Sequence, residues 1–253
     1  MKRNVLIFVL FVGFVFSVFA QNASDFQYTE SNGTITITGY SGSVKDVVIP
    51  DRINGLPVSA IGLGAFINKQ LTSITLPNSL RTIGDYAFAQ NRLTSITLPN
   101  SLTSIGNSAF FDNRLTRIVI PNSLTAIGAW VFAQNQLTSI TLPNTLTAIG
   151  EGTFAKNQLT SITLPNSLTT IGEGAFGVNQ LTSITLPGSV KTIGYGAFGN
   201  NKITSVVIPN SVVNLGNAFD ANVRITRGTS TTPGRTGSGP EIWRASPTGD
   251  GFE

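Results

Sequence analysis

The residue types that usually carry enzyme chemistry are rare in this chain. Its 253 residues include no histidine and no cysteine, which removes the commonest general base, the commonest metal ligand and the commonest strong nucleophile. Carboxylates occur at Asp85, Asp112, Glu151 and Glu173, and only Glu151 and Glu173 recur at a spacing that could bring them together as a glycosidase pair. We interpret all four as solvated loop charges. We therefore expect no enzyme activity, no cofactor and no metal site.

Serine and threonine hydroxyls are the polar groups that recur most regularly. Four consecutive outward pairs form a predicted partner-binding strip: Ser95 and Thr97, Arg117 and Val119, Ser139 and Thr141, and Ser161 and Thr163. Threonine suits a solvent-facing strand, which explains the hydroxyls without any ligand. The alternative is recognition, because solenoids bind partners on such a surface and because Arg117 and Val119 interrupt the hydroxyl pattern.

These pairs belong to a unit that repeats along the middle of the chain. One copy is residues 93–114, LTSITLPNSLTSIGNSAFFDNR. Other copies follow at a constant spacing of 22 residues and begin at Leu71, Leu115, Leu137, Leu159, Leu181 and Ile203. A period of about 20 to 29 residues with apolar residues at fixed offsets is typical of a leucine-rich-repeat solenoid.

The unit favours a turning chain over a long helix. Ile96, Thr97 and Leu98 alternate with period two, which predicts a short strand with its aliphatic side chains inward and Thr97 outward. Pro99 ends this strand, and Gly106 is expected to supply a flexible bend. Stacked coils about 4.8 Å apart would cover one another's apolar rows and pair their strands into a parallel sheet on one face.

Two rows of identical residues are expected inside this stack. The aromatic row would be Phe88, Phe110, Phe132, Phe154, Phe176 and Phe198. The amide row would be Asn91, Asn113, Asn135, Asn157, Asn179 and Asn201. A carboxamide has two donors and an acceptor, so these asparagines are interpreted as a ladder that satisfies backbone groups where each coil bends, and not as ligand-binding residues.

The same residues carry a resemblance. The pattern L-x-x-I-x-L-P-x-x-L-x-x-I-G-x-x-A-F-x-x-N resembles the BspA-like class of bacterial leucine-rich repeats, in the short form common in treponemes and other spirochaetes. The match covers roughly residues 26–227. It implies a non-enzymatic surface protein used in adhesion, with host matrix proteins or other bacterial surfaces as partners.

The N-terminal residues form two distinct segments. Residues 1–20 begin with a basic pair, continue as an apolar run and end in Val-Phe-Ala, which is typical of a secretory signal peptide and predicts a mature chain that starts at Gln21. An uncleaved anchor helix is the alternative. Residues 21–46 contain two alternating segments around Asn32-Gly33, which predicts a β-hairpin cap on the first coil.

The remaining boundaries follow from the repeat. We expect a solenoid of about eight coils over residues 47–227, including one divergent coil with a longer loop after Pro50. Residues 228–253 are rich in Gly, Ser, Thr and Pro and are expected to be a flexible or extended tail. Within it, residues 241–246 would either return as a capping strand or form a free end.

Charge narrows the partner class. Removal of the signal peptide leaves 14 basic and 12 acidic residues, and charged residues make up only 11% of the chain. No basic stripe is present, so nucleic-acid binding is not expected, and no membrane span is expected after signal removal. We expect an exported protein, extracellular or on the cell surface, that binds a protein or a glycan. The alternatives are a structural periplasmic or envelope protein, and a carbohydrate- or ice-binding surface, which is disfavoured because leucine-rich sheets usually curve.

Overall fold

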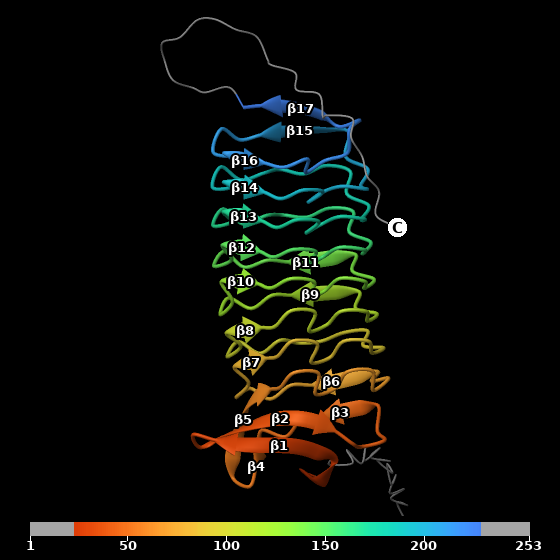
Figure 1. Cartoon of the computed structure of the whole chain (residues 1–253), viewed down its shortest axis with the longest axis vertical. Coiled ribbons are helices and arrows are strands. Elements are labelled where there is room, and N and C mark those ends of the chain that lie inside the picture. Colours follow the sequence, from red (N-terminus) through yellow and green to blue (C-terminus); the bar gives the residue numbers. More distant parts are fainter. Residues whose placement is uncertain (1–22, 229–253) are drawn as a thin grey trace, which may run out of the picture.

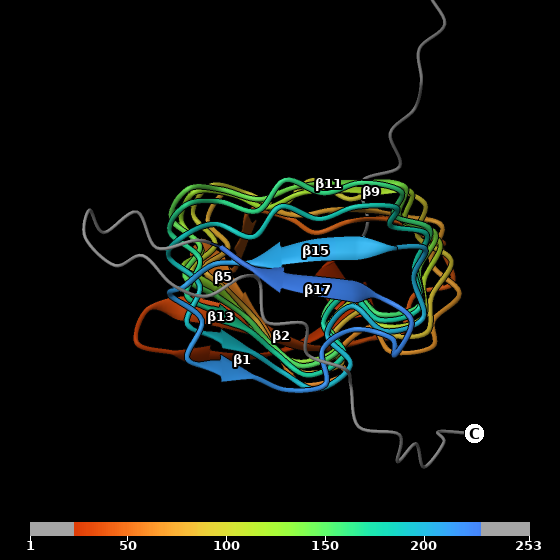
Figure 2. The same ribbon diagram turned by 90° about the horizontal axis from the view of Figure 1, so that it is seen from above.

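The computed structural model describes residues 23–228, which form a straight column of stacked coils (Figure 1). The column begins with a short 3-10 turn, Ala23–Asp25, and the rest of the described chain contains strands and turns without any further helix. The predicted leucine-rich-repeat solenoid is confirmed. Its axis is straight in this view, while Figure 2 shows the middle coils offset from the coils at the two ends.

The N-terminal end is closed by the predicted hairpin. Strands β1 (Phe26–Ser31) and β2 (Thr34–Tyr40) are antiparallel, and Asn32 and Gly33 between them have φ values of 50° and 73°. Both values are positive, as a tight two-residue hairpin turn requires. β2 then pairs in parallel with β5 (Leu56–Ile61), so the hairpin covers the sheet edge of the first coil.

Two sides of the column carry parallel strands. We call the first side the Thr-Ile ladder; it contains β5, β7 (Thr82–Ile83), β8 (Ser104–Ile105), β10 (Ala126–Ile127), β12 (Ala148–Ile149), β13 (Thr170–Ile171), β14 (Thr192–Ile193) and β16 (Asn214–Leu215). Hydrogen bonding joins β5, β7 and β8 in one sheet and the other five in a second. The sequence pattern did not indicate this ladder, although it is the most continuous pairing in the described chain.

The second side is the one predicted from the sequence, and we call it the Ser-Ile-Thr face. Its strands pair as β3 (Asp46–Val48) with β6 (Ser73–Thr75), β9 (Arg117–Val119) with β11 (Ser139–Thr141), and β15 (Ser205–Ile208) with β17 (Arg224–Arg227). Residues 95–97, 161–163 and 183–185 continue the face without strand pairing. Figure 2 shows that β9 and β11 lie on a different side of the coil from β13.

The longer loop after Pro50 folds into a second hairpin. β4 (Arg52–Ile53) pairs with the start of β5, and Asn54 and Gly55 form the turn with φ values of 52° and 78°. This is the same Asn-Gly signal that marks the first hairpin. The insertion therefore adds an antiparallel flap at the end of the column and leaves the stacking of later coils unchanged.

The glycine after each Thr-Ile strand has a different role from the one expected. Gly106 has a φ outside the left-handed region, so it is not needed as a flexible bend. A β-carbon built on Gly84 would lie 2.9 Å from the carbonyl carbon of Gly62, and one on Gly150 would lie 2.7 Å from that of Gly128. Real β-carbons do not approach so closely. Glycine is present here because successive coils touch at this corner.

The aromatic row forms the axis of the core. Its rings, from Phe66 to Phe219, are stacked with centroids 5.1–5.7 Å apart. Tyr40 of the hairpin stacks on Phe66 at 5.5 Å and so ends the row with another ring. Each ring from Phe66 to Phe198 is at most 1% exposed. The prediction of a continuous aromatic spine is confirmed.

The asparagine row holds successive coils together. Asn113 is representative: its Nδ2 donates to the carbonyl oxygens of Phe88 in the preceding coil, at 2.9 Å, and Phe110 in its own coil, at 3.2 Å. Its Oδ1 accepts from the backbone N–H of Leu93 at 3.1 Å. Asn91 to Asn201 repeat this arrangement. The predicted ladder is confirmed.

The C-terminal end closes more loosely than the middle. Phe219 still stacks on Phe198, but Asn222 is exposed and does not extend the asparagine ladder. β17 adds a strand to β15, and Arg224 and Arg227 stand at its two ends. Charges on an edge strand discourage further pairing. The predicted signal peptide at residues 1–20 and the capping strand at residues 241–246 lie outside the described residues.

Candidate functional site

The Ser-Ile-Thr face presents all eight side chains that the sequence analysis proposed for partner binding. They are exposed to solvent in every case: Ser95, Thr97, Arg117, Val119, Ser139, Thr141, Ser161 and Thr163. The intervening isoleucines point inward, and Ile118 is buried. The geometry therefore places the strip on one accessible side of the column.

The centre of this strip differs from the rest. In the β9–β11 pair, Arg117 lies opposite Ser139 and Val119 lies opposite Thr141. Val119 is 62% exposed. An arginine with five N–H donors and an exposed apolar side chain thus stand side by side among hydroxyl groups. Both departures are outward, so the packing of the core does not require them.

A depression lies at the C-terminal end of the same face. It has a volume of about 660 Å³ and is lined by residues of two successive coils and of β17. Val207, which replaces the threonine of other coils, is among them and is 59% exposed. Arg224 also lines it. This end therefore repeats, more weakly, the combination of an arginine with an exposed valine.

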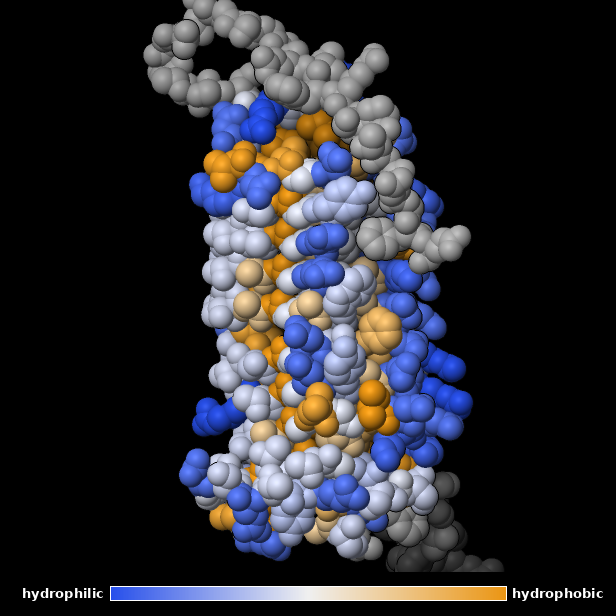
Figure 3. Space-filling view, viewed as in Figure 1, coloured by the Kyte–Doolittle hydropathy of each residue, from blue (hydrophilic) through white to orange (hydrophobic). Residues whose placement is uncertain are grey.

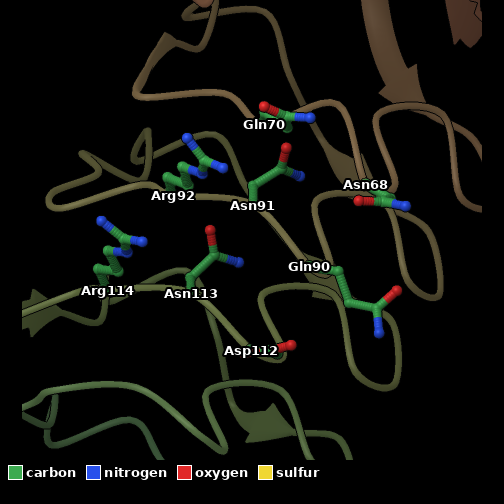
Figure 4. A pocket seen from close by; sticks show the side chains of 8 residues that line it. All are labelled: Asn68, Gln70, Gln90, Asn91, Arg92, Asp112, Asn113 and Arg114. Atoms are coloured by element: carbon green, nitrogen blue, oxygen red, sulfur yellow. The ribbon is translucent and has the colours of Figure 1, made fainter.

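A second depression lies where coils bend before each new Ser-Ile-Thr segment (Figure 4). It has a volume of about 370 Å³, and its lining residues are Asn68, Gln70, Gln90, Asn91, Arg92, Asp112, Asn113 and Arg114. Figure 4 shows Arg92 and Arg114 one above the other, with both guanidinium groups directed the same way. Every side chain in this lining is polar. The sequence analysis did not select these residues.

The turn after the Thr-Ile ladder contains a third unusual feature. The residue two places after the ladder glycine adopts the left-handed conformation in each of these coils. It is a glycine at Gly64, Gly152, Gly174 and Gly196. In three adjacent coils the residue is instead Tyr86, Ser108 or Trp130, with φ values of 54°, 55° and 59°. A bulky residue with such a φ is an outlier. At this turn the non-glycine residues lie in the N-terminal half of the column, whereas a second left-handed turn in each coil carries Lys156, Val178 and Asn200 in the C-terminal half.

Trp130 is held flat against the next coil. A β-carbon built on Gly152 would fall into the indole ring, so the ring covers that glycine, which is buried. The side chain is nevertheless 37% exposed, and Tyr86 is 47% exposed. Figure 3 shows a narrow apolar seam along this view of the column, with neutral and hydrophilic side chains beside it. These two aromatic groups add to the other apolar side chains that are exposed along the column, which include Leu63, Val178 and Tyr195.

The carboxylates do not assemble into a reactive group. Asp85 uses its Oδ1 to accept the backbone N–H of Asn107 at 2.7 Å, which fixes a turn between coils. Asp112, Glu151 and Glu173 are exposed. Among residues 23–228, no three His, Cys, Asp or Glu side chains come together as metal ligands. No helix in this part of the chain is long and apolar enough to cross a membrane.

Solved structures with similar folds include bacterial leucine-rich repeat proteins. A leucine rich cell surface protein from Faecalibacterium prausnitzii is 23% identical, with a TM-score of 0.52 and coverage of 83% of this chain and 76% of its own. The pneumococcal vaccine antigen PcpA is 18% identical, with a TM-score of 0.52 and coverage of 84% and 82%. The T. pallidum leucine rich repeat protein is 28% identical, with a TM-score of 0.44 and coverage of 79% and 83%.

No curated protein matches the chain, but a family model does. The family model for the BspA type leucine rich repeat region matches in six copies, over residues 59–177 and 104–226. These residues include the aromatic spine from Phe66 to Phe219, the whole asparagine ladder and most of both strand-bearing sides of the column. The chain therefore belongs to the BspA-type leucine-rich repeat family.

Proposed function

We propose that this protein is an exported, surface-displayed binding protein without enzyme activity, and that it docks a protein partner on the Ser-Ile-Thr face. Leucine-rich repeat proteins of this family generally act as scaffolds for protein interactions. The cell surface protein of F. prausnitzii shares the fold, which supports a surface location. Extracellular matrix proteins and the surfaces of other bacteria are the partner class we propose for adhesion.

The observation that carries this proposal is the pair Arg117 and Val119. Arginine is enriched at binding hot spots, and its planar fork can contact a carboxylate or a backbone carbonyl of a partner. Val119 beside it supplies apolar area that a partner can cover. In the next coil the equivalent positions hold Ser139 and Thr141, so the fold accepts a serine and a threonine there.

Binding to immobilised matrix proteins tests the docking surface. Fibronectin, fibrinogen, laminin and collagen serve as probes, and the parent protein is compared with a variant that carries Arg117→Ser and Val119→Thr. We expect the variant to bind the positive probe at least about tenfold more weakly, as loss of a hot spot does. Val207→Thr makes the same valine-to-threonine change at the C-terminal end of the face and should bind like the parent, because docking is proposed for the centre of the strip. Loss of binding by this variant would move the site to the C-terminal depression.

Two outcomes would reject the proposed surface. Parent-like binding by the double variant would mean that this strip is not the site and that Arg117 and Val119 are unselected changes in one repeat. Failure of the parent to bind any of the four proteins would reject matrix proteins as the partner class. A circular dichroism melt of each variant shows whether the fold has been kept.

Export is tested separately from binding. Mass spectrometry of the native protein should find Gln21 as its first residue, and retention of residues 1–20 would reject the signal-peptide prediction. Protease treatment of intact cells should cleave a surface-displayed protein. Survival on intact cells, with cleavage only after the envelope is opened, would favour the structural periplasmic role instead.

One structural observation favours a second candidate function. The column is straight in the view of Figure 1, and a regular hydroxyl array along a straight column suits a carbohydrate- or ice-binding surface. The hydroxyl array is nevertheless interrupted by Arg117 and Val119, which separates it into two shorter parts. Thermal hysteresis of a concentrated solution provides the test. Absence of any hysteresis would remove ice binding as a function.

A further inference from the structure

The depression in Figure 4 contains a pair of like charges that the fold does not require. Arg92 and Arg114 occupy the last position of consecutive coils, so they are stacked neighbours. The equivalent residues in other coils are Gln70, Gln136, Gln158, Gln180 and Lys202. Two adjacent like charges repel each other, whereas glutamine would not. The pair is therefore a departure on the outside of a unit whose inside is constant.

The two guanidinium groups are not neutralised within the described chain. Their backbone N–H groups bond to Leu71 and Leu93, but between residues 23 and 228 their side chains form neither a hydrogen bond nor an ion pair. Both are exposed and point in the same direction (Figure 4). Two guanidinium groups with five N–H donors each thus line one depression, and each can make bidentate contact with an anionic group.

The rest of the lining indicates what kind of anion fits. Asn68, Gln70 and Gln90 add carboxamides, which donate and accept hydrogen bonds as sugar hydroxyls do. Asn91 and Asn113 are fully used in the ladder and hold the wall in place. No apolar side chain lines the depression, so the aromatic and aliphatic anchors of a protein partner would find no pocket here.

Asp112 is the only acidic side chain in the lining. It lies in a tight turn with φ of 53°, at the position held by Gln90 in the preceding coil and with φ of 57° there. Figure 4 shows both residues on the same side of the depression, away from the two arginines. A carboxylate at that side accepts hydrogen bonds from hydroxyl groups and repels anionic groups. The lining is thus cationic on one side and hydroxyl-binding on the other.

We propose that this depression binds an acidic polysaccharide, with a sulfate or carboxylate between Arg92 and Arg114 and with sugar hydroxyls on Gln70, Gln90 and Asp112. A chain that is polar throughout and carries anionic groups meets every part of the lining. The lining includes neither Arg117 nor Val119, so this proposal does not depend on the protein-docking proposal.

Binding of defined heparin fragments to the purified protein tests this site. The informative variant carries Arg92→Gln and Arg114→Gln, which introduces the residue found at this position in four other coils. The matched control is Lys202→Gln, the same change of charge at the same position four coils beyond Arg114. Hyaluronan, neutral dextran and poly-glutamate are the comparison probes. Circular dichroism melts show that each variant is folded.

We expect the parent to bind heparin and the double variant to bind it at least about tenfold more weakly. The slope of log Kd against the logarithm of the salt concentration should be smaller by roughly 1.5 in the double variant, because two cations have been lost. Lys202→Gln should change the affinity less than about twofold. Hyaluronan binding that the double variant loses would equally support an acidic polysaccharide.

Four results would overturn the proposal. Heparin binding that the double variant retains would place the site elsewhere. Poly-glutamate binding of equal strength and equal sensitivity to the variant would indicate an acidic protein segment as the ligand. Dextran binding as tight as heparin binding would remove the role of charge. Absence of binding to either acidic polysaccharide would remove the ligand class, and would leave the matrix-protein proposal to its own test.

Discussion

Residues 71–136 and residues 137–202 are two halves of one column with the same interior and different exteriors. Both halves bury the same aromatic ring and the same asparagine in each coil, and the rings are at most 1% exposed in either half. The exteriors differ at equivalent positions. The first half carries Tyr86, Arg92, Arg114, Arg117, Val119 and Trp130, where the second half has Gly174, Gln180, Gln158, Ser161, Thr163 and Gly152. Lys202 is the one cation of the second half at the position of Arg92 and Arg114.

This difference separates what the fold demands from what it tolerates. The second half shows that the coil stacks with glutamine, serine, threonine and glycine at the outer positions. Packing of the core therefore does not explain the arginines, the valine or the two aromatic residues of the first half. Two of these residues, Tyr86 and Trp130, also adopt a left-handed conformation that costs an ordinary residue about 1–2 kcal/mol, at a turn where the second half has glycine. At the other left-handed turn the two halves are alike, since Lys156, Val178 and Asn200 of the second half adopt this conformation as well. We infer that function is concentrated on the first half of the exterior.

The largest expected effect tests whether the two interiors are equivalent. Phe110→Ala and Phe154→Ala each remove a fully buried ring with a stacked ring on both sides, and each should lower the free energy of unfolding by about 3–5 kcal/mol. Phe219→Ala should cost clearly less, because Phe219 stacks on only one described ring and is 6% exposed. Urea denaturation measures all three. Equal losses at Phe154 and Phe219 would contradict the stacked-column model.

The asparagine ladder should show the same equality at a smaller magnitude. Asn113→Ala leaves the buried N–H of Leu93 without a partner, and Asn157→Ala does the same to Leu137, at a cost of about 1–3 kcal/mol for each unsatisfied group. The phenylalanine carbonyls each keep a second asparagine donor, from the neighbouring rung of the ladder. Asn222→Ala, at the exposed position beyond the ladder, is the matched control and should be nearly neutral. A strong effect at Asn222 would mean that the ladder continues past its described end.

Glycine substitutions sharpen the contrast at the turn after the Thr-Ile ladder. Gly174→Ala places a β-carbon in open space but in the left-handed conformation, so it should cost about 1–2 kcal/mol. Gly152→Ala should cost more, because its β-carbon meets the ring of Trp130. Thermal melts of Trp130→Ala, alone and with Gly152→Ala, complete a double-mutant cycle. The excess cost at Gly152 should disappear in the double variant, and its persistence would exclude Trp130 as its cause.

The sequence predicted the parts of the fold that are encoded by repetition or by strong local signals. The aromatic spine and the asparagine ladder follow from residues that recur every 22 positions, and the hairpin cap follows from Asn32-Gly33. The Thr-Ile ladder was missed because a strand of two residues, such as Ser104–Ile105, contains no period that can be recognised. The role of Gly106 was misjudged because close contact between coils depends on the stack and is absent from a single unit.

The candidate sites were predictable to different degrees. Exposure of Arg117 and Val119 follows from strand alternation, and the structure places both outward, while their role in binding stays a prediction. Arg92 and Arg114 could have been found by comparing the last residue of each coil, since only their charges lie next to each other. The resting place of Trp130 on Gly152 could not, because it depends on the direction of a side chain between coils.

The smallest expected effect on stability comes from the exterior itself. Arg117→Ser with Val119→Thr should change the free energy of unfolding by less than about 0.5 kcal/mol, because both side chains are exposed and the new residues are those of neighbouring coils. Urea denaturation provides the value. A loss of several kcal/mol would show that these residues are structural and would remove the main argument for a docking surface.

The most direct measurement compares binding by the parent with binding by one variant. In this variant, four outer residues of residues 71–136 are replaced by those found at the equivalent positions of residues 137–202. This variant combines Arg92→Gln, Arg114→Gln, Arg117→Ser and Val119→Thr, and its affinities for heparin fragments and for the matrix protein bound by the parent are determined by surface plasmon resonance. We predict a parent-like melting curve together with the loss of both interactions. A folded variant that keeps the parent's affinity for both probes would contradict the claim that function is concentrated on the exterior of residues 71–136.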